Sequence, residues 1–249
     1  AFANTLLLFS RHGQFRLDAG AVGIGGALTP QTATITAITT YETQPNVDPI
    51  AVGRTVYFSI PKGEFSGLRD FYLEDVTGAV PVSEEVSSAV PRYLPKNIVS
   101  LVSSASEETI LAISKDEPKR VYFYKFFYEE DEKLQSSWSF WEVKGDKQVL
   151  GASIIDSDVF FIIQYSDGVY LEKCSLRPES VDPGSNLEVL LDRKIDETRC
   201  HIEVINQGGA GVQSIISLPY PTATTGIQVV VGRDVAGNTI QHGQVITPS

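Results

Sequence analysis

The chain has 249 residues, of which 42% are hydrophobic and 20% are charged, a balance typical of a folded chain with a substantial core. Its 31 Asp and Glu residues outnumber its 20 Lys and Arg residues, so the formal net charge is −11. This charge argues against a surface that grips nucleic acid, because neutralising phosphates requires clustered basic side chains. No apolar run approaches the roughly 18 residues of a membrane span.

The beginning of the chain is apolar but lacks a basic region, so residues 1–10 predict a strand and not a signal peptide. The sequence contains no Met, even at position 1. We therefore expect this chain to be a segment of a longer protein.

A hairpin is expected first, with strands at Leu6–Ser10 and Phe15–Asp18 and Gly13 at the turn. Four glycines follow within Ala19–Ala27, but no helix or βαβ context accompanies them. They predict a flexible surface loop and not a dinucleotide-phosphate cradle. An extended segment around Thr34–Ile38 comes next.

The pattern of strand, glycine turn and strand then repeats at Val52–Ile60 and Phe65–Leu73. Val82–Val90 is the one helix candidate of the chain. Ser83 can cap it, Glu84 and Glu85 suit the positive end of its dipole, and Pro91 can stop it. Such a short helix would depend on neighbouring structure for its stability, and we expect it to link two blades.

The middle of the chain carries seven short apolar or alternating runs separated by polar turns such as 115–119, 144–147 and 166–168. Runs rich in Val, Ile, Phe, Tyr and Trp with such breaks predict antiparallel hairpins in an up-and-down meander, the unit of propeller blades or barrels. The runs are Ile98–Ser103, Thr109–Ile113, Arg120–Tyr128, Gln135–Val143, Val149–Ile155, Val159–Tyr165 and Gly168–Leu176.

Aromatic residues alternate on both faces of the run at 135–143. Trp141 shares one face with Val143, whereas Trp138 and Phe140 share the other. A strand with large apolar side chains on both faces is expected to lie between two neighbouring sheets.

A connector rich in Pro and Gly is expected at residues 177–186. We predict an all-β chain whose antiparallel meanders form β-propeller-like blades over residues 1–176. Residues 187–249 are expected to begin a second, β-rich insertion module, with short strands at Glu188–Leu191, His201–Ile205, Ser214–Leu218 and Ile227–Val231.

The candidate chemistry of the turns is weak. Four consecutive carboxylates at Glu129–Glu132 lack the alternation of a calcium loop, so they predict a solvated turn that protects a sheet edge. Asp156–Asp158 and Ser166–Gly168 are expected to be hairpin turns. Glycoside hydrolysis needs two carboxylates flanking a sugar, and the sequence neither supplies nor excludes such a pair.

The histidines and cysteines show no metal-binding or catalytic spacing. His12, His201 and His242 lie in three different regions, and Cys200 and His201 are strand neighbours that point to opposite faces. Cys174 and Cys200 are expected to be thiols packed as small apolar groups, with a disulfide as the alternative. We predict no catalytic, cofactor-binding or metal-binding residue and no cofactor, and the sequence identifies no ligand-binding residue.

The sequence resembles the tail tubular protein B, or nozzle, family of T7-like podoviruses over about 190 residues. The matching segments keep the family's order along the chain and consist of strand and turn residues. They are Leu8–Ser10, Gln14–Phe15, Leu28–Gln31, Asp75–Thr77, Lys133–Val143, Leu150–Ala152, Gly168–Lys173 and Leu191–Lys194.

The resemblance implies the central part of a longer nozzle subunit located in the virion tail. Such subunits are expected to be β-propellers with β-rich insertions that form a hexameric ring below the tail adaptor, tail tubular protein A, near the tail fibres. The ring would form the nozzle of a short, non-contractile tail that carries DNA into the host. An acidic lumen would let a duplex pass without specific binding.

A carbohydrate-active propeller is the alternative, as either a glycan-binding or a glycan-degrading tail protein. This alternative follows from the fold by analogy. A pocket with two suitably spaced carboxylates, or an aromatic platform beside polar groups, would favour it.

Overall fold

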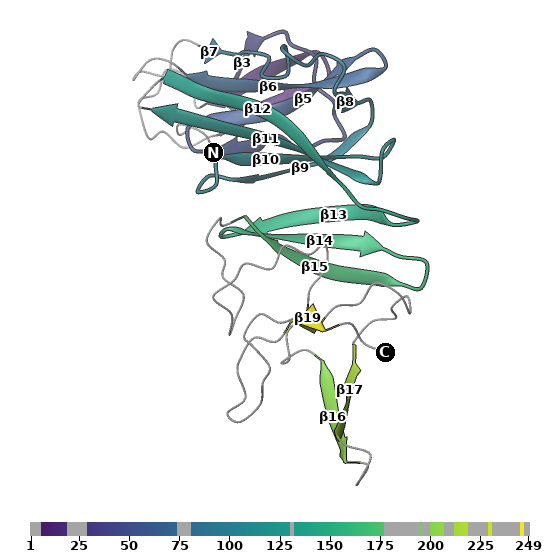
Figure 1. Cartoon of the computed structure of the whole chain (residues 1–249). Coiled ribbons are helices and arrows are strands. Elements are labelled where there is room, and N and C mark those ends of the chain that lie inside the picture. The colour runs from purple at the N-terminus through teal and green to yellow at the C-terminus, as the bar shows by residue number, and fades with distance from the viewer. Residues whose placement is uncertain are drawn as a thin grey trace. The chain divides into compact units, whose positions relative to one another are not determined.

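The computed structural model divides the chain into two compact units, Ala1–Arg177 and Pro178–Ser249. Strands that can be described occur in both units (Figure 1). The structure describes residues 6–18, 29–73, 81–129, 132–176, 195, 200–206, 212–218, 229–230 and 245–246.

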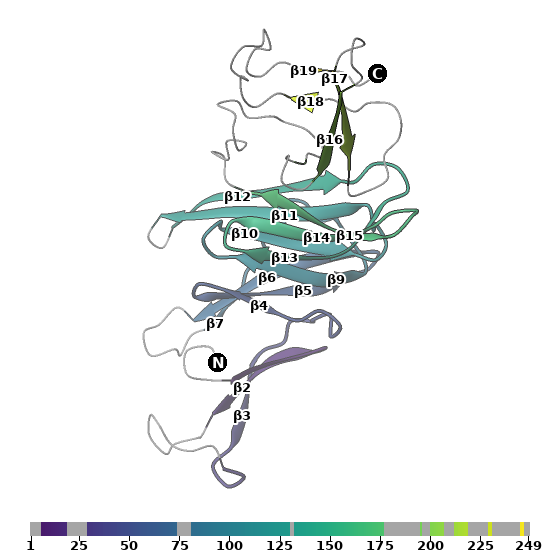
Figure 2. The same cartoon turned by 90° about the horizontal axis from the view of Figure 1, so that it is seen from below.

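The first sheet contains β1 (Leu6–Ser10), β2 (Gly13–Asp18) and β3 (Thr34–Thr39) in antiparallel order, with β2 and β3 side by side in Figure 2. The predicted hairpin is present, but its turn lies at residues 11–12 and Gly13 begins β2. A Cβ on Gly13 would lie 2.7 Å from the carbonyl oxygen of Thr39. Glycine is required here by close backbone approach and not by turn geometry.

The second sheet has the order β4-β5-β6-β7, and β8 pairs with the beginning of β6. The run expected at 52–60 is divided by a turn at Gly53, whose φ is +59°, and Gly63, with φ +66°, turns β5 into β6. Both positive φ values favour glycine. The strands are β4 (Ile50–Val52), β5 (Thr55–Lys62), β6 (Phe65–Leu73), β7 (Pro81–Val82) and β8 (Leu94–Pro95).

The helix predicted at Val82–Val90 is wrong, and the described part of the chain contains no helix. This segment runs beside β6 instead, where the Val86 N–H donates to the Leu68 carbonyl at 3.0 Å. The Ser83 hydroxyl donates to the Asp70 carbonyl and does not cap a helix. A helix of this length would be marginal, so pairing with a strand and burial of Val86 outweigh the local signals.

All seven strands predicted in the middle of the chain are present, but they form two meanders and not one. One sheet has the order β12-β11-β10-β9, and the next has the order β13-β14-β15 (Figure 1). The strands are β9 (Ile98–Ser104), β10 (Thr109–Ser114), β11 (Arg120–Glu129), β12 (Glu132–Glu142), β13 (Gln148–Ile155), β14 (Asp158–Gln164) and β15 (Val169–Ser175).

The division between the two meanders follows from β10, in which all six residues are buried. Such a strand needs apolar cover on both faces of its sheet. Leu111 and Ile113 point toward Val159 and Phe161 of the β13–β15 sheet, whereas Ile110 contributes to the cluster on the opposite face. After the turn at 143–147, β13 therefore packs over the sheet and does not extend its edge.

Three hydrophobic clusters join the four sheets of the first unit in sequence order. Phe58 and Phe71 pack against the β1–β3 sheet, and Tyr57 and Leu68 pack against the β9–β12 sheet from the opposite face. The third cluster joins the β9–β12 and β13–β15 sheets. The first unit is thus a stack of antiparallel sheets in which consecutive sheets share a core.

The aromatics of β12 lie on the two faces predicted, but β12 is the edge strand of its sheet, and Phe140 and Trp141 are 41% and 42% exposed. Trp138 packs near Tyr124 and its Nε1–H donates to the Val86 carbonyl at 3.1 Å, on the face toward the second sheet. Trp141 lies on the other face, with its ring centroid 4.1 Å from that of Phe123 and 6.2 Å from that of Phe161.

The described strands make the fold all-β and antiparallel, as predicted. They form no closed propeller ring, so the propeller remains an expectation. In the second unit β16 pairs with β17 and β18 with β19, whereas the connector at 177–186 and the strand expected at Glu188–Leu191 lie outside the described residues. These strands are β16 (His201–Asn206), β17 (Val212–Ser217), β18 (Val229–Val230) and β19 (Val245–Ile246).

Candidate functional site

A buried ion pair joins the second and third sheets. Asp70 of β6 is 1% exposed, and its Oδ2 lies 3.2 Å from Nζ of Lys133 of β12. Its Oδ1 accepts a 2.6 Å hydrogen bond from the N–H of Glu84. Burial alone would lower the pKa of Lys133, but Tyr124, Tyr128 and Asp70 outweigh it and hold that pKa above its ordinary value. Both carboxylate oxygens are satisfied, which is typical of a structural ion pair.

Three tyrosines line the same layer. Tyr57 is fully buried, and its pKa is raised by burial first and then by Tyr128 and Tyr124. Although Tyr128 is close enough to influence that pKa, the Tyr57 hydroxyl has no hydrogen-bond partner of acceptable geometry. The Tyr124 hydroxyl is 3.1 Å from the Ser136 hydroxyl. These tyrosines therefore belong to the hydrophobic core that joins the second and third sheets.

A second charged network lies at the surface where β11 begins. The Arg120 guanidinium is 2.6 Å from Glu142 and 3.0 Å from Glu117, and it lies over the Phe140 ring at 4.5 Å. Tyr122 donates to the same Glu117 carboxylate. Because each charged group of this network is engaged by another, the network fixes the end of the β11–β12 hairpin.

The carboxylate turns considered from the sequence do not converge. Asp156 is an exposed turn residue with φ +56°, whereas Asp158 pairs with Lys173 at 2.7 Å. Asp167 accepts a 2.7 Å hydrogen bond from Tyr170 in its own turn. In the run of carboxylates at 129–132, Glu129 is exposed and residues 130–131 lie outside the described part. Among described residues, no group of three or more His, Cys, Asp and Glu side chains could hold a metal ion.

The histidines stay apart along the chain. His12 is exposed in the turn between β1 and β2, His201 begins β16 in the other unit, and His242 is not among the described residues. Cys174 packs against the cluster between the third and fourth sheets, as expected for a small apolar group. Neither Cys174 nor Cys200 forms a disulfide. The predicted glycine-rich loop at 19–27 also lies outside the described residues.

The β13–β15 sheet exposes an apolar outer face. Ile162 and Leu171 are opposite each other in register and are 44% and 70% exposed. Ile155 and Val169 extend this face at 59% and 58%. The residues between them in sequence, such as Phe161, are buried in the core on the inner face. Large exposed apolar surfaces of this kind mark contacts with further structure.

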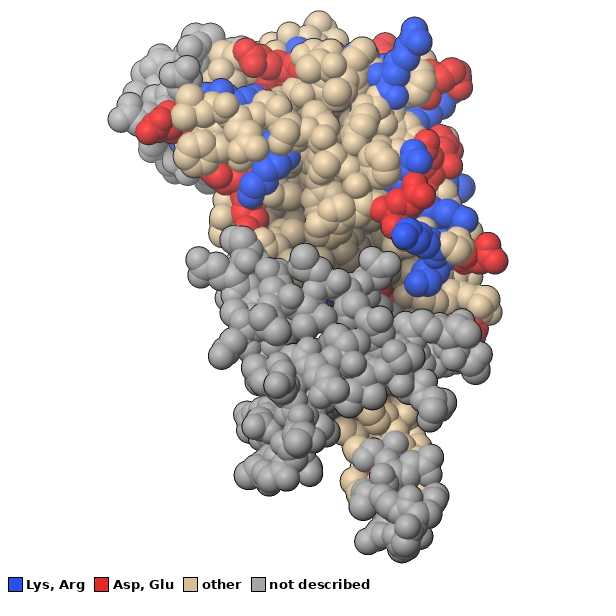
Figure 3. Space-filling model, in the orientation of Figure 1, with Lys and Arg blue, Asp and Glu red and all other residues tan. Residues whose placement is uncertain are grey.

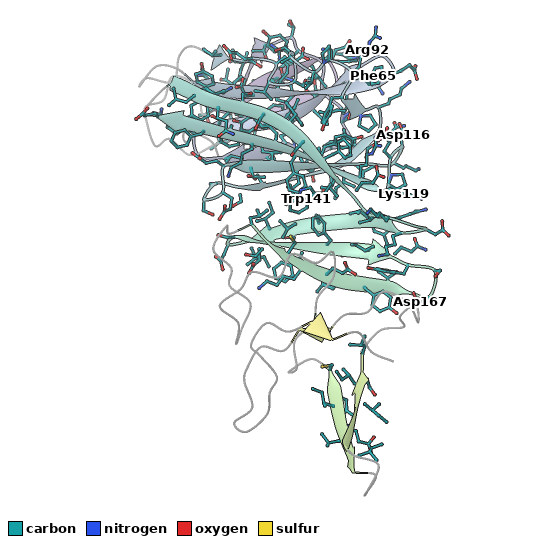
Figure 4. The ribbon with its side chains drawn as sticks, viewed as in Figure 1. Phe65, Arg92, Asp116, Lys119, Trp141 and Asp167 are labelled. Carbon is teal, nitrogen blue, oxygen red and sulfur yellow. The ribbon has the colours of Figure 1, made fainter. Side chains whose placement is uncertain are left out.

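Two turns that carry charged side chains of both signs meet at one end of the third and fourth sheets. Turns 115–119 and 144–147 lie side by side, because the Val143 N–H donates to the Lys119 carbonyl at 2.9 Å and the Val149 N–H to the Pro118 carbonyl at 2.7 Å. Charged side chains gather along the right-hand edge in Figure 3, and Figure 4 labels Asp116 and Lys119 there. We call Lys115, Lys119, Lys144 and Lys147 the lysine surface.

Several carboxylates and Lys125, whose ammonium donates to the Glu107 carbonyl, occupy the opposite end of the same strands. Glu107 and Glu108 form the turn between β9 and β10, and Asp156 lies in the turn between β13 and β14. The Ser104 hydroxyl donates to the Asp156 carbonyl at 3.4 Å, which brings these turns together.

The sequence predicted where the turns lie, but it did not predict which side chains form ion pairs or which turns lie next to each other. Asp70 and Lys133 are 63 positions apart, and no local pattern links them. The lysine surface had a partial signal in the two lysine-containing turns, but their adjacency depends on how β13 crosses over the preceding sheet. No described helix is long and apolar enough to cross a membrane.

Comparison with known proteins gives two similarities. Residues 1–246 match the family model of bacteriophage nozzle proteins. The chain is also 30% identical over 198 residues to tail tubular protein gp12 of Escherichia phage T7. That alignment covers 79% of this chain and 24% of the T7 protein, so the chain spans about a quarter of the length of this relative.

Proposed function

Because this chain belongs to the bacteriophage nozzle protein family, and is thereby a structural component of the phage tail, we propose that it builds part of the wall of a short, non-contractile tail tube. The tube would carry DNA from the capsid into the host during ejection. The proposal concerns the longer protein of which sequences like this one form a part.

The sheet stack is the observation that carries the proposal. Four antiparallel sheets, consecutive in sequence, share cores face to face, and the last sheet presents Ile162 and Leu171 outward. Antiparallel sheets packed face to face in sequence order would suit consecutive blades of a β-propeller. We propose that further sheets of the full-length protein continue the stack and close it, which gives a rigid building block for a tube.

Assembly into a ring completes the proposal. Six copies would surround a channel and contact the tail adaptor, tail tubular protein A, and the tail fibres. The net charge of −11 supports passage of DNA without specific binding, because an acidic wall repels phosphates.

The proposed role is not enzymatic. The family is one of structural tail proteins, and Asp158 and Asp167 are each engaged by a neighbouring side chain of their own sheet. The glycan-degrading alternative therefore gains no specific support.

Gold labelling of intact virions tests the location within the tail. Antibodies raised against this chain should label the distal tail of virions from the source lysate. Fibre-deficient virions should keep the label, because the tube wall does not depend on the fibres. Two results would contradict the proposal. One is that virions carry no gold label and the antigen occurs only free in the lysate; the other is that the label is confined to the fibres.

A further inference from the structure

We propose that the open edge of β12 accepts a strand from another part of the full-length protein, which pairs with residues 136–142. The added strand would be an extended, uncharged segment of the same polypeptide with apolar side chains on both faces. Its presence is independent of where in the virion the protein lies, and so of the proposed function.

The strand β12 ends its sheet, and β11 occupies one of its two sides (Figure 1). Among the described residues, no strand pairs with the other side. With 11 residues, β12 is about twice as long as an ordinary strand. The third sheet therefore has a long edge that is open to another strand.

The hydrogen-bond ladder shows which backbone groups of β12 face the open side. The Val143 N–H donates to the Lys119 carbonyl at 2.9 Å, one step beyond the register pair of Glu142 and Arg120. Because hydrogen-bonded and non-hydrogen-bonded pairs alternate along an antiparallel ladder, every second residue of β12 turns its N–H and C=O groups away from β11. These residues are Ser136, Trp138, Phe140 and Glu142.

The other side of β11 gives the same assignment. The Phe126 N–H donates to the Glu108 carbonyl at 3.0 Å, so Phe126 bonds toward β10 and not toward Ser136, its neighbour on β12. In the part of the chain that the structure describes, the outward backbone groups of β12 have no hydrogen-bond partner. Each outward residue thus offers one donor and one acceptor to an added strand.

The sequence of this edge lacks the features that usually keep exposed edges from pairing. Residues 134–141 contain no charged residue and no Pro. The register shift between β11 and β12 lies at the beginning of this stretch, so the edge is regular from Gln135 onward. Natural proteins blunt such edges with Lys, Pro or bulges, or they cover them. Because the first three are missing here, we infer that the edge is covered.

The side chains along this edge suit an apolar strand. Phe140 and Trp141 lie on opposite faces of β12 and are 41% and 42% exposed. Side chains of an adjacent strand contact such residues directly, and pairs of aromatic and β-branched residues stabilise a sheet. An added strand with apolar residues on both faces would therefore bury both rings further.

The length of the protein favours a strand of the same polypeptide. The alignment covers 24% of the T7 relative, so a protein of that length has many further segments. A tethered segment acts at an effective concentration of about millimolar, whereas a second copy is far more dilute. The tethered strand would also prevent copies from pairing edge to edge through this uncharged stretch.

Amide hydrogen exchange of the full-length protein, resolved by residue, tests for the added strand. The Trp138 and Phe140 amides should exchange at least about a hundredfold more slowly than freely exposed amides, because hydrogen-bonded amides exchange only when the strand opens. The Ser139 amide, which bonds to β11, is the internal reference. Fast exchange at Trp138 and Phe140 beside slow exchange at Ser139 would show that the edge is open and would overturn the proposal.

Dilution of the protein identifies the source of the strand. Protection of the Trp138 and Phe140 amides should not depend on protein concentration, because the strand belongs to the same polypeptide. Protection that disappears on dilution would assign the edge to a second copy. Protection that occurs only in assembled virions would assign it to another tail protein. Either result would contradict a tethered strand.

Ser136→Pro removes one outward N–H and places a ring against the added strand. Ser136→Ala is the matched control, because it removes the same hydroxyl contact with Tyr124 and keeps the N–H. Ser136→Pro should speed exchange at Trp138 and Phe140 at least about tenfold relative to Ser136→Ala, because proline is tolerated only at an edge that faces solvent. Exchange at Ser139 should stay slow in both variants, which shows that the sheet remains folded. Equal exchange at Trp138 and Phe140 in the two variants would rule out an added strand.

Discussion

At the scale of single residues, the pair of Asp70 and Lys133 determines how strongly the second sheet holds the third. Lys133→Met leaves the 1% exposed Asp70 carboxylate without its cation. We expect a loss of about 2 kcal/mol in the free energy of unfolding, less than for a fully buried pair because Lys133 is 21% exposed. Urea denaturation measures this loss.

The double variant Asp70→Asn/Lys133→Met is the matched control for that prediction. It removes both charges and keeps an oxygen that can accept from the Glu84 N–H. It should regain at least half of the lost stability. A Lys133→Met variant as stable as the wild type would show that the pair contributes nothing.

The unpaired hydroxyl of Tyr57 gives a second prediction. Tyr57→Phe removes a group without a hydrogen bond, so stability at pH 7 should be unchanged or rise by up to about 1 kcal/mol. Tyr124→Phe removes a hydroxyl beside Ser136 and should cost about 1 kcal/mol. Thermal unfolding of the two variants side by side separates these effects, and a larger loss from Tyr57→Phe would contradict the account.

The same tyrosine predicts an alkaline limit to stability. Burial holds the pKa of Tyr57 above its ordinary value of 10.0, so the folded chain keeps a proton that the unfolded chain releases. This contribution is fully present below about pH 10 and is lost as the pH rises from there toward the folded pKa. Tyr57→Phe should flatten the fall in stability above pH 10, and an identical fall in both proteins would contradict the assignment.

At the scale of elements, the first sheet depends on a glycine for close backbone approach. Gly13→Ala places a Cβ 2.7 Å from the Thr39 carbonyl oxygen, so β3 must move away from β2. We expect a destabilisation of about 1–3 kcal/mol, the usual range for overpacking. Gly151→Ala in β13 is the control, because a Cβ there meets nothing within 4 Å. Equal unfolding midpoints for the two variants would exclude this reason for the glycine.

Strand periodicity predicted the middle of the chain well, because buried β10 and alternating β12 carry strong local signals. It failed at 82–90, where capping residues imitated a helix but pairing with β6 prevailed. It also could not divide seven strands into two sheets. That division depends on the packing of the β13–β15 sheet over one apolar face of β10. The residues of the turn at 143–147 do not indicate whether the next strand extends the sheet or packs over it.

The candidate surfaces were less predictable than the strands. The exposed face of Ile162 and Leu171 follows the alternation of β14 and β15, but a sequence alone does not say which face is covered. The partnership of Asp70 with Lys133 depends on packing between sheets far apart in the chain. The sequence therefore predicted the alternation of side chains within strands, but it did not predict the contacts between sheets.

At the scale of the whole molecule, the outer face of the fourth sheet should be covered in the full-length protein. Leu171→Glu places a charge on that face, so it should reduce incorporation of the full-length protein into virions at least about tenfold. Quantitative immunoblotting of purified virions measures incorporation. Ser166→Glu, which places the same charge at an exposed position in the turn between β14 and β15 and not on that face, should be incorporated normally. Normal incorporation of Leu171→Glu would leave the exposed face without a structural role.

Cryo-electron microscopy of the tail of the parent phage tests the central claim most directly. The account predicts six copies around the channel, each with the four sheets stacked in sequence order and a further sheet covering Ile162 and Leu171. A tail tube wall that lacks this chain, or one in which that face of the β13–β15 sheet meets only solvent, would contradict it.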